Sequence, residues 1–149
     1  MTGVWVLLGV LVLGGVAGAL LRARNGRIRA AKPAKSTAPT LPGRVSDALA
    51  AEGVTLVQIS TTFCAPCRHT RAILSALAEK TDGLTHVDLD VTETPEVAQA
   101  LSVLRTPTTL ALTADGREVF RVGGVPRGQD LLDALKPHLI PDSGKRPKV

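Results

Sequence analysis

The sequence has very few aromatic residues. Of its 149 residues only Trp5, Phe63 and Phe120 are aromatic, and tyrosine is missing altogether. A domain core therefore has to be built from Val, Leu, Ile and Ala, which are abundant. No phosphate-binding loop, Rossmann glycine pattern or internal repeat occurs. These absences argue against nucleotide-binding folds and repeat architectures, and the length leaves room for about one domain.

Acidic residues are also missing from the N-terminal part of the chain, where none precedes Asp47. The formal net charge of +5 is therefore local, because the residues after Pro42 carry 12 Lys and Arg against 13 Asp and Glu, a net charge of −1. A nucleic-acid-binding domain would need a basic face, and this composition predicts none. The six N-terminal basic residues are Arg22, Arg24, Arg27, Arg29, Lys32 and Lys35.

One long apolar run is present. Val4 to Leu21 contains neither charge nor proline, and 18 residues nearly match the length of a membrane-spanning helix. Trp5 suits an interfacial position, and the basic residues that follow the run favour a cytoplasmic domain by the positive-inside rule. We therefore expect a single-pass cell-membrane protein that contacts lipid through this helix. The alternatives are an extracytoplasmic domain and a cleaved secretory signal, for which Ala17-Gly18-Ala19 offers small residues.

Composition divides the chain into four segments. Residues 1–21 are expected to be the anchor, and 22–43 a basic juxtamembrane segment and Pro-rich linker that holds the domain off the bilayer. Residues 44–140 form the predicted domain, and 141–149 a disordered tail.

Within the domain, apolar runs of strand length alternate with segments of helical spacing. This order predicts an α/β fold with a mixed sheet of about four strands flanked by helices. Helices are expected at 45–51, 64–80, 94–103 and 129–139, and strands at 54–60, 84–91, 108–113 and 118–122.

Both cysteines of the chain lie in one motif, Cys64-Ala65-Pro66-Cys67, at the predicted junction of a strand and a helix. Unpaired N–H groups at a helix N-terminus stabilise a thiolate, so the first thiol is expected to be reactive. The second thiol lies one helical turn further along, where it can attack a mixed disulfide formed by the first. Pro66 is tolerated there because early helix N–H groups lack partners.

Three segments together resemble the thioredoxin family: Phe63 to Arg68, Val103 to Thr108, and Val122-Gly123-Gly124 followed by Gly128-Gln129. The resemblance covers roughly residues 41–140. It implies a thioredoxin-like fold and a thiol–disulfide oxidoreductase that needs no cofactor beyond its redox-active disulfide. It also implies protein thiols or disulfides as substrates and an electron donor such as a thioredoxin reductase.

The resemblance assigns roles to individual residues. Cys64 would be the exposed nucleophile, Cys67 the buried resolving thiol, and Pro107 a cis-proline, a form found in only about 5–6% of X–Pro bonds. The substrate would dock on an apolar surface made of Phe63, Ala65, Pro66, Thr106, Pro107 and Gly123.

The sequence also departs from the family. Phe63 replaces the usual Trp, and no clear strand precedes Val45. The buried acid of many thioredoxins falls at Gln58, and the lysine often paired with it falls at His86. Glutamine cannot take up a proton, so the usual route for deprotonating Cys67 is missing. His86 or a water molecule is the alternative proton acceptor.

Three other functions use the same motif. A thioredoxin-like binding module with weak redox activity would explain the missing acid. A zinc site would need two further ligands near Cys64 and Cys67, and the histidines are poorly placed for that, so no metal site is predicted. A soft-metal carrier could use the two thiolates alone.

Overall fold

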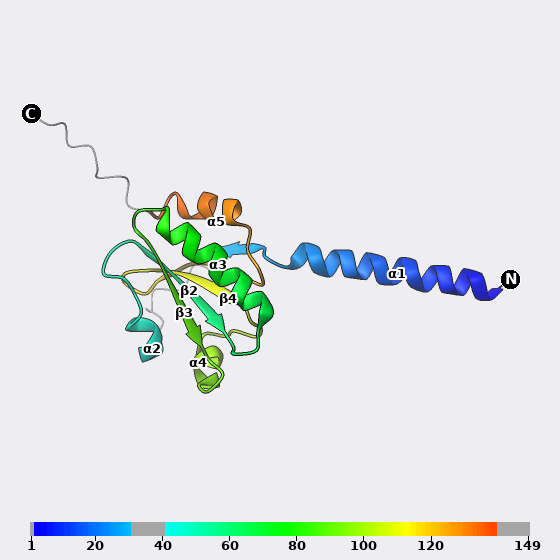
Figure 1. Ribbon diagram of the computed structural model, residues 1–149, viewed down its shortest axis with the longest axis horizontal. Helices are drawn as coiled ribbons and strands as arrows, with labels where there is room; N and C mark the ends of the chain where they lie inside the picture. The colour runs from blue at the N-terminus through cyan, green and yellow to red at the C-terminus, as the bar shows by residue number, and fades with distance from the viewer. Residues whose placement is uncertain (1, 31–40, 140–149) are drawn as a thin grey trace, which may run out of the picture.

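The computed structural model describes residues 2–30 and 41–139, so most of the predicted Pro-rich linker and the tail lie outside the described residues. The chain begins with one long helix that projects from the rest of the molecule, α1 (Thr2–Arg24) (Figure 1). The remaining elements are β1 (Ile28–Ala30), α2 (Gly43–Ser46), β2 (Val54–Ser60), α3 (Ala65–Glu79), β3 (Leu84–Asp90), α4 (Pro95–Ala100), β4 (Thr108–Thr113), β5 (Glu118–Gly123) and α5 (Gly128–Leu135).

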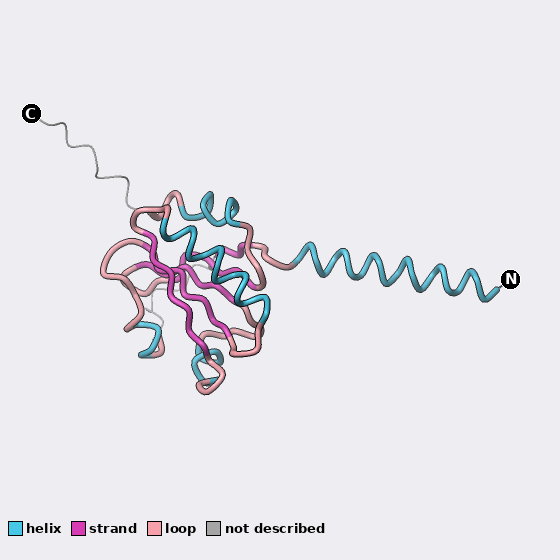
Figure 2. The backbone as a smooth tube through the Cα atoms, viewed as in Figure 1, coloured by secondary structure: helices cyan, strands magenta, loops and turns pink. Residues whose placement is uncertain are grey.

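The strands form one mixed sheet in the order β1-β5-β4-β2-β3. The pair β2–β3 is parallel, whereas β2–β4, β4–β5 and β1–β5 are antiparallel. The predicted mixed sheet with flanking helices is confirmed (Figure 2). A parallel pair joined through a helix and closed by an antiparallel hairpin follows directly from the order of the elements.

The sheet has five strands rather than the four expected, because residues 28–30 form β1. Its register pairs Ile28 with Val122 and Ala30 with Phe120. Ile28 also packs against the core. The sequence placed these residues in a juxtamembrane linker, since three residues with one arginine among them carry no readable strand pattern. Pairing with the outer edge of β5 is what makes them a strand.

The core lies on both faces of the sheet, because alternate residues of a strand point to opposite sides. Under α3 and α5, Leu56 and Phe120 pack with Leu74. Under α2 and α4, Val57 packs with Leu110. Phe120 is the only aromatic residue in either cluster, so the core is aliphatic as the composition indicates.

Helix α1 contains a candidate membrane span of 21 residues, Gly3–Ala23, which is apolar except for Arg22 near its end, and none of it is buried against the domain. Its length and composition are sufficient to cross a bilayer, although a signal sequence would satisfy the same criteria. The expected N-terminal apolar helix is therefore present.

Candidate active site

The two cysteines meet at the junction of β2 and α3. Cys64 is the residue that precedes the first turn of α3, and it forms a disulfide with Cys67, with 5.2 Å between their Cα atoms. This separation is ordinary for a disulfide. The backbone N–H of Cys67 lies 3.2 Å from Cys64 Sγ, at the end of the helix where N–H groups are unpaired. Pro66 lies in the first turn, where its missing N–H removes no helix bond.

The two sulfur-bearing residues differ in exposure. Cys67 is only 2% exposed, whereas Cys64 is half-buried and reaches the surface. A thiol or disulfide of another molecule can therefore approach Cys64 and not Cys67. The geometry permits a sequential exchange in which the outer sulfur reacts first.

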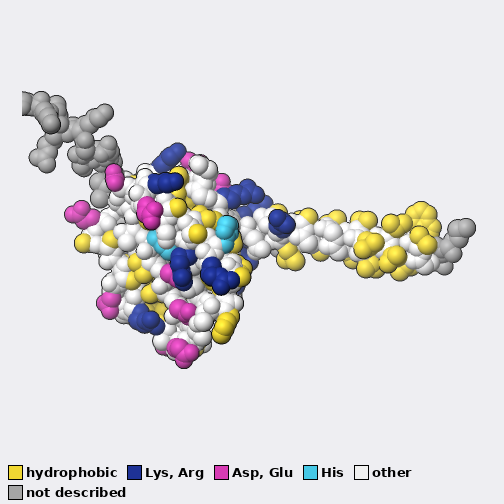
Figure 3. All heavy atoms as spheres, in the orientation of Figure 1, with side chains coloured by type: hydrophobic (Ala, Val, Ile, Leu, Met, Phe, Trp, Pro, Cys, Tyr) yellow, Lys and Arg dark blue, Asp and Glu magenta, His cyan; other side chains and the backbone are white. Residues whose placement is uncertain are grey.

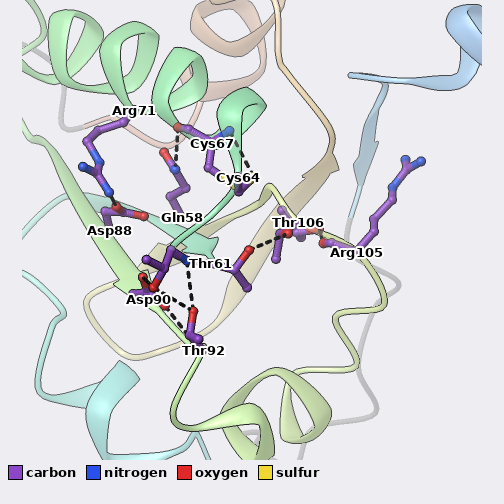
Figure 4. Close-up of a disulfide and its surroundings, with 12 residues drawn as sticks. Gln58, Thr61, Cys64, Cys67, Arg71, Asp88, Asp90, Thr92, Arg105 and Thr106 are labelled. Carbon is purple, nitrogen blue, oxygen red and sulfur yellow. Dashed lines mark hydrogen bonds and ion pairs between the residues drawn. A yellow bond between two sulfur atoms is a disulfide. The ribbon is translucent and has the colours of Figure 1, made fainter.

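A cis peptide bond joins Thr106 and Pro107, as the resemblance predicted. Thr106 lies beside the turn that precedes the cysteines, with its hydroxyl 3.4 Å from the Thr61 hydroxyl (Figure 4). Pro107 is buried, and its carbonyl accepts a 2.7 Å hydrogen bond from the N–H of Gly124. The cis-proline loop is therefore attached both to the end of β2 and to the turn after β5.

Two large apolar side chains project from the surface, one next to Cys64 in the chain and one in the loop that leads to Thr106. Phe63 and Leu104 are each 98% exposed, and Ala65 and Pro66 are exposed between them in the chain. Every other exposed large apolar side chain among the described residues belongs to α1. Leu104 was not among the residues predicted for the docking surface. Its signal was available, because an apolar residue in the loop before Thr106-Pro107 has no core position to fill.

The turn before Cys64 is held by a small polar network. Asp90 accepts hydrogen bonds from the Thr92 N–H (2.8 Å) and the Thr62 hydroxyl (3.0 Å), and Thr62 N–H donates to the Thr92 hydroxyl (3.0 Å). The contacts with Thr92, followed by that with Thr62, lower the pKa of Asp90 because they stabilise its charged form. This network fixes the backbone on which Phe63 and Cys64 are presented.

Gln58 lies beneath the cysteines and is completely buried. Its amide Nε2 donates a 3.0 Å hydrogen bond to the carbonyl of Cys67, and its Oε1 has no hydrogen-bond partner among the described residues. The sheet register places Gln58 between Asp88 of β3 and Thr109 of β4. These three side chains form a polar row across the sheet under α3.

The register also shows which residue of β3 is the direct neighbour of Gln58. The residue beside Gln58 is Asp88, whereas His86 is paired with Leu56, two residues further from the cysteines. The sequence analysis missed Asp88 because the offset between two parallel strands cannot be read from either strand alone.

Asp88 and His86, two of the titratable residues of β3, have different surroundings. Asp88 is 14% exposed and forms an ion pair with Arg71 through Oδ2, and its Oδ1 is buried without a partner among the described residues. His86 has Nδ1 3.1 Å from the Ser75 hydroxyl. Burial is the main cause of a lowered pKa of His86, opposed by the Asp88 charge, so the ring is neutral at pH 7.

Within residues 2–30 and 41–139, no group of three or more His, Cys, Asp and Glu side chains is placed to hold a metal ion.

Comparison with known proteins agrees with this geometry. The family model described as Thioredoxin matches residues 42–137. Thioredoxin from Staphylococcus saprophyticus is 35% identical over 88 residues, which cover 58% of this chain and 84% of that protein. Thioredoxin from Staphylococcus aureus strain Mu50 is 34% identical over 94 residues, covering 62% and 89%. The crystal structure of a thioredoxin from Nicotiana alata superposes with a TM-score of 0.54 at 30% identity, covering 65% of this chain and 81% of that one.

Proposed function

Because this chain belongs to the thioredoxin family and is a thiol–disulfide oxidoreductase, we propose that it reduces or exchanges disulfides of other proteins while α1 tethers it to a membrane. Thioredoxins use no cofactor beyond the disulfide itself. The observation that carries the proposal is the pairing of an accessible Cys64 with a buried Cys67 at the N-terminus of α3.

The reaction starts from the reduced pair. The Cys64 thiolate attacks one sulfur of the substrate disulfide, which breaks that S–S bond and releases the other substrate sulfur as a thiolate. Cys67 then loses its proton and attacks Cys64 Sγ, so the mixed disulfide breaks and the Cys64–Cys67 disulfide forms. Two electrons pass to the substrate, whose two sulfurs end as thiols. An external donor such as a thioredoxin reductase then restores the dithiol.

The local structure supports Cys64 as the nucleophile. The N-terminus of α3 presents unpaired N–H groups, and that of Cys67 already lies 3.2 Å from Cys64 Sγ. The same N–H groups and the helix dipole stabilise a thiolate, which lowers the pKa of a thiol in this position. Attack at pH 7 thus needs no separate base for Cys64.

Cys67 needs a proton acceptor, and we assign this role to Asp88 in place of His86. Gln58 cannot accept a proton and instead holds the Cys67 carbonyl. His86 lies opposite Leu56 and contacts Ser75. Asp88 lies one strand away from Gln58, a separation of about 4.8 Å between neighbouring strands, and its Oδ1 has no partner among the described residues.

The substrate docks on the surface around Cys64. Phe63 and Leu104 supply apolar area, and the backbone at Thr106 pairs with an extended substrate segment. Burying one such side chain contributes about 1.5–3 kcal/mol, which is sufficient to orient a disulfide. The remaining members of this docking surface are Ala65, Pro66, Pro107 and Gly123.

The membrane anchor is α1, and we place the domain in the cytoplasm. Arg22, Arg24, Arg27 and Arg29 follow the apolar stretch, and basic residues next to a span favour the cytoplasmic side. Dithiols are kept reduced there, so the protein acts as a reductase. An extracytoplasmic domain would instead exchange or oxidise disulfides according to its partner.

The catalytic assignment is tested with the full-length protein in membranes, by insulin disulfide reduction with dithiothreitol or a thioredoxin reductase. We expect Cys64→Ser to abolish turnover and Cys67→Ser to trap mixed disulfides through Cys64. The double variant is the matched control and should trap nothing. Substrate capture that persists without both cysteines would instead favour a binding module. This is the second candidate function, because position 58 carries a glutamine where many thioredoxins have an acid.

Sidedness is tested by labelling Cys64 in intact cells with a membrane-impermeant thiol reagent, with permeabilised cells as the control. A cytoplasmic domain is labelled only after permeabilisation. Labelling of intact cells would place the domain outside.

A further inference from the structure

The redox site lies on the side of the domain where α1 is attached, and from this geometry we propose that its substrates are disulfides in the juxtamembrane segments of integral membrane proteins. This inference rests on the proposed membrane anchoring. It concerns which disulfides can reach Cys64, and it depends on how α1 is joined to the domain.

The join is short. Helix α1 ends at Arg24 and β1 begins at Ile28, so only three residues lie between the apolar helix and the sheet. Strand β1 is then paired along its whole length with β5. The Pro-rich segment expected to separate the domain from the bilayer follows β1 in the chain, and therefore cannot set that separation.

The three joining residues are themselves attached to the domain. The N–H of Gly26 donates a 3.0 Å hydrogen bond to the carbonyl of Gly123. Arg105 donates from Nη1 to Asn25 Oδ1 (3.1 Å) and from Nη2 to the same Gly123 carbonyl (3.1 Å). Gly26 has a positive φ of 74°, and a Cβ there would collide with the backbone of Val125, so a glycine is needed at this close approach.

These attachment points border the redox site. Arg105 directly precedes Thr106-Pro107, and Gly123 is paired with Thr108 across β4 and β5. Figure 4 shows Arg105 extending toward the pale blue N-terminal ribbon, with Thr106 on the side of Thr61. The loop that faces the disulfide is thus also the loop that holds the end of the anchor.

The length of the join fixes the depth of this loop. The candidate membrane span ends at Ala23, and Gly26 follows three residues later. Three residues span at most roughly 10 Å when fully extended. The headgroup layer adds about 5–8 Å on each side of a hydrocarbon core of about 30 Å. With α1 across the bilayer, Gly123 and Arg105 therefore lie at or just above the headgroups.

The surface chemistry near the join suits this position. Arg22, Arg27 and Arg105 are exposed, and Figure 3 shows dark blue Lys and Arg side chains gathered where α1 meets the domain. Each basic side chain close to an anionic headgroup layer contributes about 1 kcal/mol of attraction. Phe63 and Leu104, fully exposed around Cys64, offer apolar area in the same region.

This placement selects substrates by access. A soluble protein would have to enter the space between the domain and the bilayer, whereas a membrane protein already carries its juxtamembrane disulfide at that height. Confinement of both partners to one membrane also raises their effective concentration. Cys64 is thus positioned to exchange with disulfides a few ångströms above the headgroups.

The test changes only the height of the site. In a full-length Cys67→Ser background, a flexible ten-residue Gly-Ser segment is inserted between Arg24 and Asn25, which leaves the Asn25 and Gly26 contacts intact. The matched control carries the same segment between Lys35 and Ser36, beyond β1. Mixed-disulfide adducts from cells are separated into integral membrane and soluble proteins.

We expect the parent and the control to trap mainly integral membrane proteins. The insertion after Arg24 should lower that fraction several-fold and raise the soluble fraction. Equal adduct profiles in all three proteins would overturn the inference.

Two measurements distinguish this failure from failure of the proposed function. Insertion variants with Cys67 intact should reduce insulin in detergent as fast as the parent. Loss of activity in every variant, the parent included, would mean that the oxidoreductase assignment is wrong. Resistance of the parent to carbonate extraction tests the anchor itself.

Depth is measured directly by tryptophan fluorescence. In a Trp5→Phe background, Leu104→Trp should be quenched by brominated lipids in vesicles, and the insertion after Arg24 should remove the quenching. Glu52→Trp is the control and should not be quenched. Glu52 is exposed and lies just before the start of β2, roughly 20 Å from the end of that strand that leads to Cys64. Equal quenching at both positions would contradict an oriented site.

Discussion

The sheet has one face whose centre is mainly aliphatic and one that becomes polar toward the cysteines. Under α2 and α4, Val57, Ile59 and Leu110 are completely buried. Under α3, the strand positions nearest the disulfide carry Gln58 and Thr109, with several buried polar atoms that have no partner among the described residues. Each such atom costs about 1–3 kcal/mol. The comparison indicates that the first face supplies stability and that the polar end of the second serves the chemistry.

The largest expected effect tests the apolar face. Leu110→Ala removes a completely buried side chain from the central strand β4, and a loss of about 2–5 kcal/mol in the free energy of unfolding is expected. Chemical denaturation of the full-length protein measures it. Leu104→Ala makes the same chemical change at a 98% exposed position and should leave stability unaltered. Similar losses in both variants would mean that burial does not set stability here.

The next effect tests the polar end. Asp88→Asn should slow the attack of Cys67 on the mixed disulfide by about 10- to 100-fold near neutral pH, because a positioned base is lost. Asp88→Glu should restore the rate of that step in part. Asp133→Asn also removes an acid from an ion pair, at the surface of α5, and serves as the control. An unchanged rate of that step in Asp88→Asn would exclude the assigned role.

A smaller effect compares two adjacent threonines on opposite faces. The Thr108 hydroxyl donates a 2.7 Å hydrogen bond to the Arg105 carbonyl, whereas the Thr109 hydroxyl has no partner among the described residues. Thr108→Val should destabilise the protein by about 0.5–1.5 kcal/mol, and Thr109→Val should be neutral or stabilising. Thermal unfolding of the two variants measures the difference, and the opposite order would contradict the hydrogen-bond assignment.

The smallest effect concerns His86. Burial lowers its pKa in the folded protein, so between its folded and unfolded pKa values the unfolded chain binds more protons. Stability should therefore decline as the pH falls below about 6.5, the unperturbed value. His86→Gln should reduce this slope, as measured by denaturation between pH 7.5 and 5. His69→Gln, which replaces a histidine exposed on α3, is the matched control.

Much of the site could be predicted from local patterns. The cysteine pair, its position between a strand and a helix, and the cis bond before Pro107 all depend on residues close together in the sequence. Leu104 and Asp88 were missed for different reasons. Leu104 carried a readable signal, because an apolar residue in the loop before Thr106-Pro107 has no core position to fill, whereas Asp88 is recognisable only once the offset of β3 against β2 is known.

The sequence by itself determined the chemistry and the class of fold, because two cysteines one helical turn apart and the alternation of strands and helices are local properties. Only the tertiary structure decided the surroundings of that chemistry. It placed Asp88 instead of His86 beside Gln58, and it paired residues 28–30 with β5, so that α1 joins the domain next to the loop of Arg105 and Thr106. Both are consequences of strand register, which is set by contacts between residues far apart in the chain.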